Sequence, residues 1–363
     1  MEIAFFINTP AQAHFFKNII RTLEKKGHQV KILARNYGET LYLLNVFSIP
    51  YFVYADIPKS KYEKILLLPY HILSAHHYLK KSDIGLVVGS GIYSLLTSFL
   101  LKKPNIQFID AISANTELNL IKRFADAIIT PSNFTVDIGE KHIKINSFKE
   151  LSYLHPNYYK ADKTVLNLMN INEGDPFALL RFNAFDSTHD FGLRGFSSKE
   201  RRIWVNELKK YGKVFISSEA FIPEDLSEHT LRIPKEKIHD VLYYSTILIA
   251  DTGTMVTEAA LLGTPAICHH PKAKAIGNFI ELEQRYGLIF SIKNPKELIE
   301  KATHFFIQKD VKKEWGVKRE RLIKEKVDIT RFMVWFIEHF PESFKIMKER
   351  PFDQERFNAP VIE

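Results

Sequence analysis

Short apolar runs alternate with amphipathic stretches along most of the chain, and this alternation limits the fold more than any other feature. IAFFIN (3–8) and QVKILA (29–34) have the length of buried strands, and apolar residues recur between them with a helical period. Strands that alternate with helices favour a parallel sheet covered by helices on both faces. Further strands are expected at 50–55, 85–90, 105–110 and 127–132.

The same pattern starts again after a polar, turn-rich stretch at 155–175. A strand is expected at 177–182, and a strand, helix and strand at 247–268. We therefore predict an α/β fold of two doubly wound, Rossmann-like parallel-sheet domains that face each other across a cleft. The length of 363 residues agrees with two domains. Their expected bounds are 1–160 and 161–330, followed at 331–363 by a helix that crosses back to the first domain and a tail.

The composition narrows the classes of partner. Hydrophobic residues make up 45% of the chain, which excludes wholesale disorder, and 50 basic against 42 acidic residues give a formal charge of +8. The basic residues are mixed with acidic ones, and no nucleic-acid-binding signature accompanies them, so no nucleic-acid partner is expected. The single cysteine, Cys268, excludes an intrachain disulfide and fits a reducing compartment, so a cytoplasmic location is expected.

One apolar segment, ILLLPYHILSAHHYL (65–79), raises the question of a membrane. No segment has the roughly 18 uninterrupted apolar residues that a spanning helix needs. We expect a core helix here, with peripheral contact between this helix and a membrane face as the alternative.

The stretch ILIADTGTMVTEAALLGTPAIC (247–268) carries the strongest signal for a binding site. Thr252 or Thr254 can cap the helix, and Gly253 removes a side chain where a phosphate would come close. The amides and dipole at a helix N-terminus attract anions. Glu258, one turn inside, leans back toward that end, where a ribose diol suits a carboxylate better than a phosphate does. The alternative is an ordinary capped helix with an exposed glutamate.

This stretch resembles the nucleotide-sugar motif in the second domain of GT-B proteins, which include many glycosyltransferases and the UDP-N-acetylglucosamine 2-epimerases. The resemblance implies that Gly253 and Thr254 contact the diphosphate and that Glu258 binds the ribose hydroxyls. With INTPAQAHFF near its start, the whole chain resembles a mostly archaeal family of about this length without assigned function. The motif does not specify the reaction.

The first loop of the first domain, NTPAQAHFF (8–16), follows a strand and carries His14. It resembles the first loop of N-acetylglucosamine transferases that act on lipid-linked acceptors, although Ala11, Gln12 and Ala13 replace the glycines of that loop. A histidine there is a candidate general base. The alternative is a helix-end histidine bonded to the backbone.

Two further polar residues follow strands of the first domain. Asp110 resembles the position of a catalytic glutamate of the epimerases, and is a candidate acid–base or sugar-binding group; the alternative is a helix cap. Where the epimerases carry a second carboxylate after the preceding strand, this chain has Ser90, which weakens the epimerase interpretation. Ser90 lies between two glycines, in a turn that could face a phosphate or the acceptor.

In the second domain, Arg181 ends the strand at 177–182, and an arginine suits a diphosphate. The alternative is a structural salt bridge. His239 is expected at a helix start near the cleft. Asp186, His189 and Asp190 lack the spacing of a metal site, so we expect a plain polar loop and no metal.

These observations predict a metal-independent glycosyltransferase of GT-B type. A nucleotide-diphosphate sugar would be its substrate, with no cofactor, and a sugar or lipid-linked acceptor would bind the first domain. His14 or Asp110 would deprotonate the acceptor, while the loop amides and Arg181 would stabilise the leaving diphosphate. Two alternatives stay open: a sugar epimerase like the UDP-N-acetylglucosamine 2-epimerases, and a nucleotide-sugar-binding protein without catalysis. The oligomeric state is left open.

Overall fold

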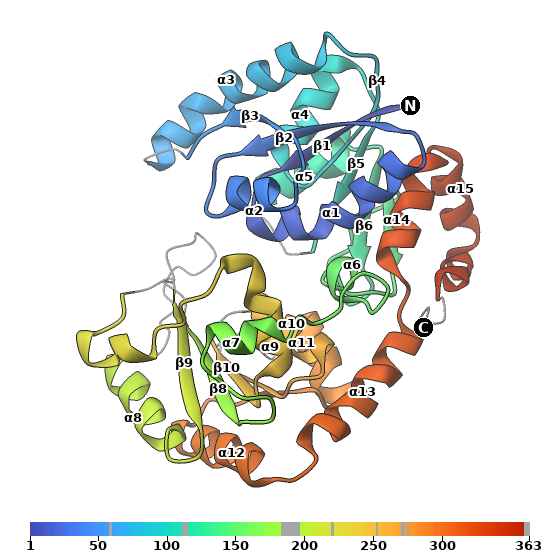
Figure 1. The fold of residues 1–363 in the computed structure, drawn as a ribbon. Coiled ribbons are helices and arrows are strands. Elements are labelled where there is room, and N and C mark those ends of the chain that lie inside the picture. The colour runs from blue at the N-terminus through green and yellow to red at the C-terminus, as the bar shows by residue number, and fades with distance from the viewer. Residues whose placement is uncertain are drawn as a thin grey trace. The chain divides into compact units, whose positions relative to one another are not determined.

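The computed structural model describes residues 1–57, 60–110, 115–182, 197–218, 221–251, 253–269, 273 and 276–358. The chain divides into two compact units: unit 1 consists of Met1–Tyr158 and Lys326–Glu363, and unit 2 of Tyr159–Glu325. Each unit has its own parallel sheet and its own apolar core (Figure 1).

The sheet of unit 1 has seven strands in the order β3-β2-β1-β4-β5-β6-β7, and its neighbours pair in parallel. The order reverses between β1 and β4, the topological switch point at which doubly wound sheets bind ligands. Only β7 was not predicted, because its four residues do not stand out from the polar turns around them. The strands are β1 (Glu2–Ile7), β2 (Gln29–Arg35), β3 (Phe52–Ala55), β4 (Ile84–Gly89), β5 (Asn105–Phe108), β6 (Ala127–Pro131) and β7 (His142–Ile145).

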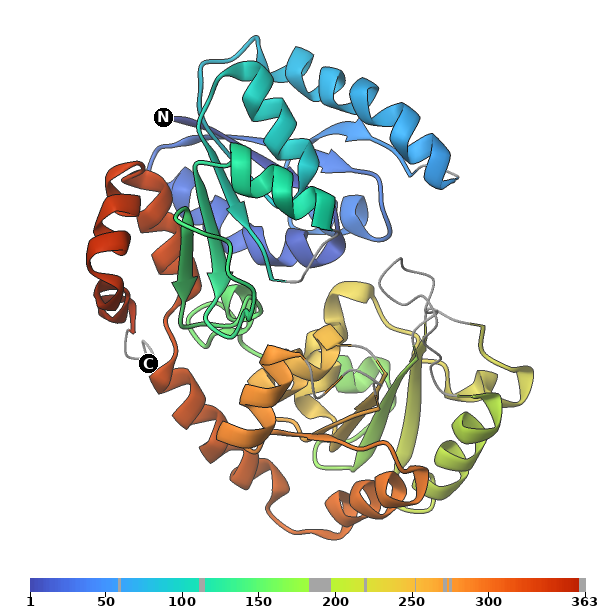
Figure 2. The same ribbon diagram turned by 180° about the vertical axis from the view of Figure 1, so that it is seen from behind.

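Helices cover both faces of this sheet (Figures 1 and 2). One layer contains α1 (Pro10–Lys25), α2 (Thr40–Val46), α6 (Leu151–Leu154) and α14 (Ile329–Glu338), and the other α3 (Lys61–Leu79), α4 (Ile92–Leu101) and α5 (Asn115–Phe124). Thr9 caps α1 and Pro10 takes its first position, while Gly27, at φ 88°, ends the connection to β2. Because α14 packs against α1, the C-terminal segment completes the first unit; α15 (Glu342–Glu349) and η6 (Pro351–Phe357) follow it.

Unit 2 has a five-stranded sheet in the order β12-β11-β10-β8-β9, with all neighbours parallel. Its switch point lies between β8 and β10. Its strands are β8 (Phe177–Phe182), β9 (Lys213–Ser218), β10 (Ile247–Ala250), β11 (Ala266–Cys268) and β12 (Ile289–Ser291). The two parallel sheets confirm the predicted doubly wound α/β class.

The helices of unit 2 form two groups. The first group is α8 (Ser198–Leu208) and α12 (Pro295–Ile307), which pack together. The second is α7 (Thr164–Leu168), α9 (Ile238–Tyr244), α10 (Gly253–Leu262) and α13 (Val311–Glu325). Short helical turns fill the remaining connections: η2 (Glu224–His229), η3 (Lys235–Lys237), α11 (Gly277–Ile280) and η5 (Glu281–Arg285). Helix α10 ends at a glycine, Gly263, whose φ of 76° suits no other residue as well.

The apolar segment 65–79 lies in α3, and only one face of this helix packs into the core. Its inner residues Ile72, Ala75 and Leu79 pack with the sheet of unit 1. No helix in the described ranges is long and apolar enough to span a bilayer. The outer face of α3 is nevertheless apolar, with exposed fractions of 82, 77, 67 and 58% for Tyr62, Leu66, Tyr70 and Leu73.

Candidate functional site

In unit 2, the structure brings together two of the residues predicted to bind the substrate. Glu258 lies one turn inside α10, and its Oε1 is 3.1 Å from Nε2 of His239 at the start of α9. Both side chains are more than nine-tenths buried. A buried carboxylate is stable only with such a partner, so the pair fixes the orientation of Glu258.

Helix α9, which carries His239, is itself anchored from the start of unit 2. The carboxylate of Asp240 accepts hydrogen bonds from the hydroxyl of Tyr159, at 2.8 Å, and from the amide of Asp162, at 3.0 Å. The ring of Tyr159 also stands edge-on to that of His239, with centroids 6.5 Å apart. Burial, followed by the charge of Asp240, raises the pKa of the Tyr159 hydroxyl. The position of His239 therefore depends on this anchored turn.

The other predicted residues of unit 2 that the structure describes lie near the same sheet edge. Arg181, the penultimate residue of β8, donates from Nη1 to Oγ of Ser217 on β9, at 2.9 Å. Gly253 begins α10, and the exposed Thr254 follows it. Thr252 lies outside the described residues, as do Asp186, His189 and Asp190.

A second arginine lies at this edge, and the sequence did not point to it. Arg201, on α8, is 8% exposed, and its guanidinium stacks 4.6 Å from the ring centroid of Phe182. Burial lowers the pKa of Arg201, and the charge of the fully buried Asp251 after β10 opposes this shift. Nothing in the sequence marked Arg201, because a basic residue in a mixed-charge helix usually faces water. The switch point of unit 2 therefore gathers several charged groups.

At the switch point of unit 1, neutral polar groups connect the ends of β1 and β4. Asn8, which follows β1, donates from Nδ2 to the carbonyl oxygen of Ser90 after β4, at 3.2 Å. The buried hydroxyl of Tyr54 on β3 donates to Oδ1 of Asn8. Asn8 belongs to the quoted NTPAQAHFF motif, and its place directly after the first strand could have identified it. The predicted Ser90 thus contributes its backbone here.

The start of α4, beside Ser90, is already capped by side chains. The amide of Gly91 donates to Oε1 of Gln107 at 2.8 Å, and the amide of Ile92 to Oε1 of Glu117 at 3.2 Å. The fully buried Gln107 also donates to Oγ of Ser94 at 2.9 Å. A phosphate at this turn would have to displace these acceptors.

His14 lies within α1 and is 8% exposed. Its ring packs between those of Tyr153 and Phe47, at centroid distances of 5.1 and 5.3 Å. A general base must reach the proton that it removes. The burial of His14 limits that reach in this conformation.

Asp110 follows β5, and a third of its side chain is exposed. Its Oδ2 is held by Nζ of Lys149, which also lies 3.8 Å from Oε1 of the buried Glu150. Lys149 precedes α6, and no motif in the sequence marked it. The structure therefore presents Asp110 as the partly exposed member of an ion-paired group.

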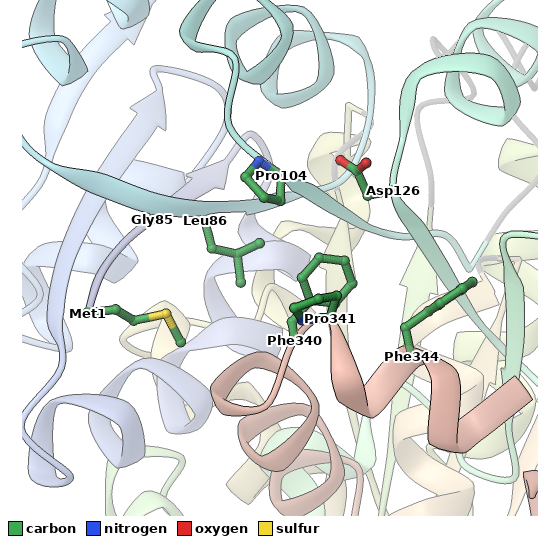
Figure 3. A pocket seen from close by; sticks show the side chains of 8 residues that line it. All are labelled: Met1, Gly85, Leu86, Pro104, Asp126, Phe340, Pro341 and Phe344. Carbon is green, nitrogen blue, oxygen red and sulfur yellow. The ribbon is translucent and has the colours of Figure 1, made fainter.

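A cavity of about 350 Å³ lies elsewhere in unit 1 (Figure 3). Leu86, Pro104, Phe340 and Phe344 line it at the amino-terminal ends of β4, β5 and β6. Its acidic residue, Asp126, accepts a hydrogen bond from the amide of Asn105 at 2.8 Å. This cavity is apolar and lies at the sheet edge opposite the switch point, so it does not fit the predicted chemistry. Across the described ranges, no group of three or more potential ligands could hold a metal ion.

Comparisons with known proteins agree with this architecture. A family model described as "Protein of unknown function (DUF354)" matches residues 2–335. Uncharacterized protein MJ0665 of Methanocaldococcus jannaschii is 22% identical over 280 residues, which cover 73% of this chain and 80% of that protein.

Two solved structures share the fold. UDP-GlcNAc 2-epimerase from Neisseria meningitidis, bound to UDP-GlcNAc, is 13% identical with a TM-score of 0.60, over 90% of this chain and 99% of that one. The glycotransferase of kitacinnamycin is 12% identical with a TM-score of 0.58, over 93% of this chain and 98% of that one. The chain therefore belongs to the family described as a protein of unknown function (DUF354), and its two Rossmann-like units have the predicted GT-B architecture.

Proposed function

We propose that this protein is a metal-independent glycosyltransferase that uses a nucleotide-diphosphate sugar, with the donor bound by unit 2 and the acceptor by unit 1. One observation carries the proposal: a buried carboxylate, Glu258, is held by His239 one turn inside the helix that follows β10. The fold supports it, because an epimerase bound to UDP-GlcNAc and a glycotransferase both share this architecture.

The donor site follows from the chemistry of the switch point in unit 2. A carboxylate has acceptor positions on both oxygens, so a ribose diol can donate to Glu258 while His239 fixes its orientation. The start of α10, at Gly253 and Thr254, would bind the diphosphate through its amides and the helix dipole. Arg181, at the end of β8, would add a positive charge.

In the transfer itself, the acceptor oxygen bonds to the anomeric carbon, and the bond from that carbon to the diphosphate oxygen breaks. The acceptor proton passes to a base, and the nucleoside diphosphate leaves with the bonding electrons. Asp110 is better placed for this role than His14, because a third of its side chain is exposed. Arg181 and the α10 amides would stabilise the charge that develops on the diphosphate.

The test is nucleotide binding by variants of Glu258, measured by titration calorimetry with UDP and UDP-GlcNAc. Glu258→Ala should weaken binding about tenfold or more, because charge-assisted hydrogen bonds from the ribose are lost. Glu258→Gln keeps the shape of the side chain and should show a similar loss. Glu297→Gln is the matched control, since Glu297 is an exposed glutamate in the first turn of α12 and should leave binding unchanged.

The titration uses a panel of nucleotides and nucleotide sugars with different bases. If no member binds the unaltered protein, or if the Glu258 variants bind as tightly as the unaltered protein, the donor site is wrong. Binding without turnover on any acceptor would favour the non-catalytic alternative.

An epimerase is the second candidate, favoured by the similarity to the UDP-GlcNAc 2-epimerase fold. Epimerisation at C2 exchanges the C2 hydrogen with solvent, whereas transfer leaves it in place. Incubation with UDP-GlcNAc in heavy water without an acceptor therefore separates the two. Deuterium at C2 would support the epimerase, and an unlabelled sugar would support the transferase.

The proposal also includes a cytoplasmic location with peripheral contact between α3 and an anionic membrane. Tyr62, Leu66, Tyr70 and Leu73 follow one face of α3, and Figure 1 shows this helix on the outside of unit 1. An apolar helix face with tyrosines suits the membrane interface, and the net charge of +8 favours anionic lipid. The cytoplasmic location rests on the single cysteine.

Co-sedimentation with liposomes tests this contact. The double variant Leu66→Ser, Leu73→Ser should abolish most of the binding to anionic vesicles, because two exposed apolar side chains are removed. Binding should also weaken as salt is raised. Leu168→Ser, at an exposed leucine of unit 2, is the control and should bind like the unaltered protein. Equal sedimentation of all three proteins would contradict the contact.

A further inference from the structure

A cation stands at the end of β2 in unit 1 without an ion-pair partner among the described residues. Leu33 of β2 packs with Ile72 and Ala75 of α3, and the alternation of side chains along a strand puts Arg35 on the same face. Nε of Arg35 is buried and has no hydrogen-bond acceptor within the described ranges. The guanidinium stacks over the ring of Tyr37, 5.1 Å from its centroid. Arg35 thus carries a partly desolvated charge at the carboxyl edge of the sheet.

A buried histidine on α3 shares the environment of Arg35. His71 is 4% exposed, and its Nδ1 has no hydrogen-bond partner in the part of unit 1 that the structure describes. Its ring lies 6.0 Å from that of Tyr93 on α4 and 5.9 Å from that of Tyr70. Burial lowers the pKa of His71, and the positive charge of Arg35 lowers it further. The charge of Arg35 therefore favours the neutral form of the His71 imidazole.

Two tyrosines connect this cluster with the switch point of unit 1. Tyr54 on β3 meets Tyr93 edge to face, with ring centroids 5.5 Å apart, and its hydroxyl donates to Asn8. The charge of Arg35 also acts on both tyrosines. Asp56 follows β3, and its Oδ1 accepts a hydrogen bond from Asn36 at 3.0 Å. No ion pair joins Asp56 to Arg35 among the described residues, so within the described ranges no carboxylate neutralises the guanidinium by direct contact.

We propose that unit 1 binds an oxyanion at the carboxyl ends of β2 and β3, held by the guanidinium of Arg35 and Nδ1 of His71. Buried polar groups without partners are uncommon in folded proteins and call for an explanation such as an ion. An oxyanion offers several acceptors at once, and the planar guanidinium matches carboxylate and phosphate groups. The cluster also lies at the sheet edge where doubly wound sheets bind ligands.

The identity of the ligand rests on the proposed function, because unit 1 is there the acceptor unit. In that case the acceptor carries an oxyanion, either the carboxylate of a sugar acid or the phosphate of a phosphorylated acceptor. The oxyanion site itself does not depend on the donor site in unit 2. The two proposals can therefore fail separately.

The test uses the full chain with isotope-labelled histidine, and inorganic phosphate and acetate as probes at constant ionic strength. A bound anion favours the protonated imidazole, so each probe that binds should move the His71 resonance saturably and raise the pKa of His71. The groups that face His71 are Arg35 from β2, Asp56 after β3, Tyr93 from α4 and Tyr70 from α3 itself. The variant His71→Gln identifies the resonance by its loss.

Arg35→Gln should weaken the phosphate response of His71 about tenfold or more, because the charged fork is gone. Arg123→Gln is the matched control, since Arg123 is exposed on α5 and stacks on Phe124. It should respond like the unaltered protein. Thermal unfolding of each variant shows that it is folded, and calorimetric titration of His71→Gln with phosphate gives an independent measure of weakened binding.

The outcomes separate the sources of the oxyanion. Tighter binding of phosphate supports a phosphorylated acceptor, and tighter binding of acetate supports a sugar acid. If neither probe moves the His71 resonance saturably, or if Arg35→Gln responds like the unaltered protein, the site is overturned. Repeating the titration on Glu258→Gln separates the proposals, because the donor-site variant should keep the full His71 response.

Discussion

The two sheets share one topological rule but place different chemistry at their switch points. In unit 1, Asn8 and the backbone of Ser90 bridge β1 and β4 as neutral groups. In unit 2, Arg181 is the penultimate residue of β8, and the His239–Glu258 pair joins the helices that precede and follow β10 in the chain. The charge beside the switch point of unit 1 is negative, because the carboxylate of Glu117 accepts from the amide of Ile92 at the start of α4.

This difference agrees with a division of work between the units. A nucleotide diphosphate is highly charged, and it needs cations and helix amides at the point of binding. The hydroxyl groups of a sugar acceptor are neutral, and amide and hydroxyl groups of the protein suit them. The contrast therefore favours unit 2 for the donor and unit 1 for the acceptor. Substitution of one glycine in each unit tests the difference between them.

The largest effect is expected for Gly89→Ala in unit 1. A methyl group on Gly89 would lie 2.6 Å from both Cβ and Oγ of Ser94 and 3.2 Å from Cβ of Phe6. Relief of this overlap would have to move β4 away from α4, which should lower the free energy of unfolding by about 2–3 kcal/mol. Urea denaturation followed by circular dichroism measures the loss. An unchanged midpoint would mean that the strand and helix are less tightly packed than the structure shows.

The same substitution in unit 2, Gly253→Ala, should separate binding from stability. Its methyl group would meet Cζ of Phe279 at 3.7 Å, an ordinary contact, and alanine suits a helix better than glycine. Stability should therefore stay within about 0.5 kcal/mol of the original, while UDP affinity in calorimetry should fall about tenfold if the diphosphate approaches this backbone. Unchanged affinity would remove Gly253 from the proposed donor site.

The smallest expected effect is a different acid sensitivity of the two units. Burial, followed by the charge of Lys144, lowers the pKa of the half-buried His142 in unit 1 to about 4. The unfolded chain takes up this proton near pH 6.5. The contribution of neutral His142 to the free energy of unfolding is therefore complete above pH 6.5 and is lost as the pH falls toward 4. Because part of the ring is exposed, solvent weakens this contribution, and we expect about 1 kcal/mol of the free energy of unfolding to depend on it.

In unit 2, a hydrogen bond from Lys237 lowers the pKa of Asp162 to about 2. Its contribution is present above pH 4 and is lost only as the pH falls toward 2. Hydrogen exchange should therefore show weaker protection of the amides of unit 1 at pH 5 than at pH 7, and little difference between the two pH values in unit 2. His142→Gln should remove this pH dependence in unit 1. An equal loss in both units would contradict the assignment.

Local sequence signals predicted much of unit 2. The small polar loop before an apolar helix located α10, and the prediction that Glu258 lies one turn inside that helix agrees with the structure. A short stretch of sequence, by contrast, does not show which distant residue a side chain will contact. His239 was identified only as a helix start, and its pairing with Glu258 follows from the packing of α9 against α10.

Unit 1 shows more clearly what a sequence leaves out. Arg35, His71 and Lys149 belong to no motif, and each looks like an ordinary polar residue in its own segment. They matter because the fold brings His71 of α3 beside Tyr93 of α4, and Lys149 against Asp110 after β5. The hydrophobic periodicity of a single segment does not show which distant segments will contact it.

The amino-acid sequence alone determined the two alternations of strand and helix and the small polar residues at the start of α10. These features depend on residues within a few positions of one another, and local backbone preferences encode them. The tertiary structure decided which distant side chains meet: Glu258 with His239, and Asp110 with Lys149. The order of the strands determines these contacts, because it sets which strand ends become neighbours and which charged groups are removed from solvent.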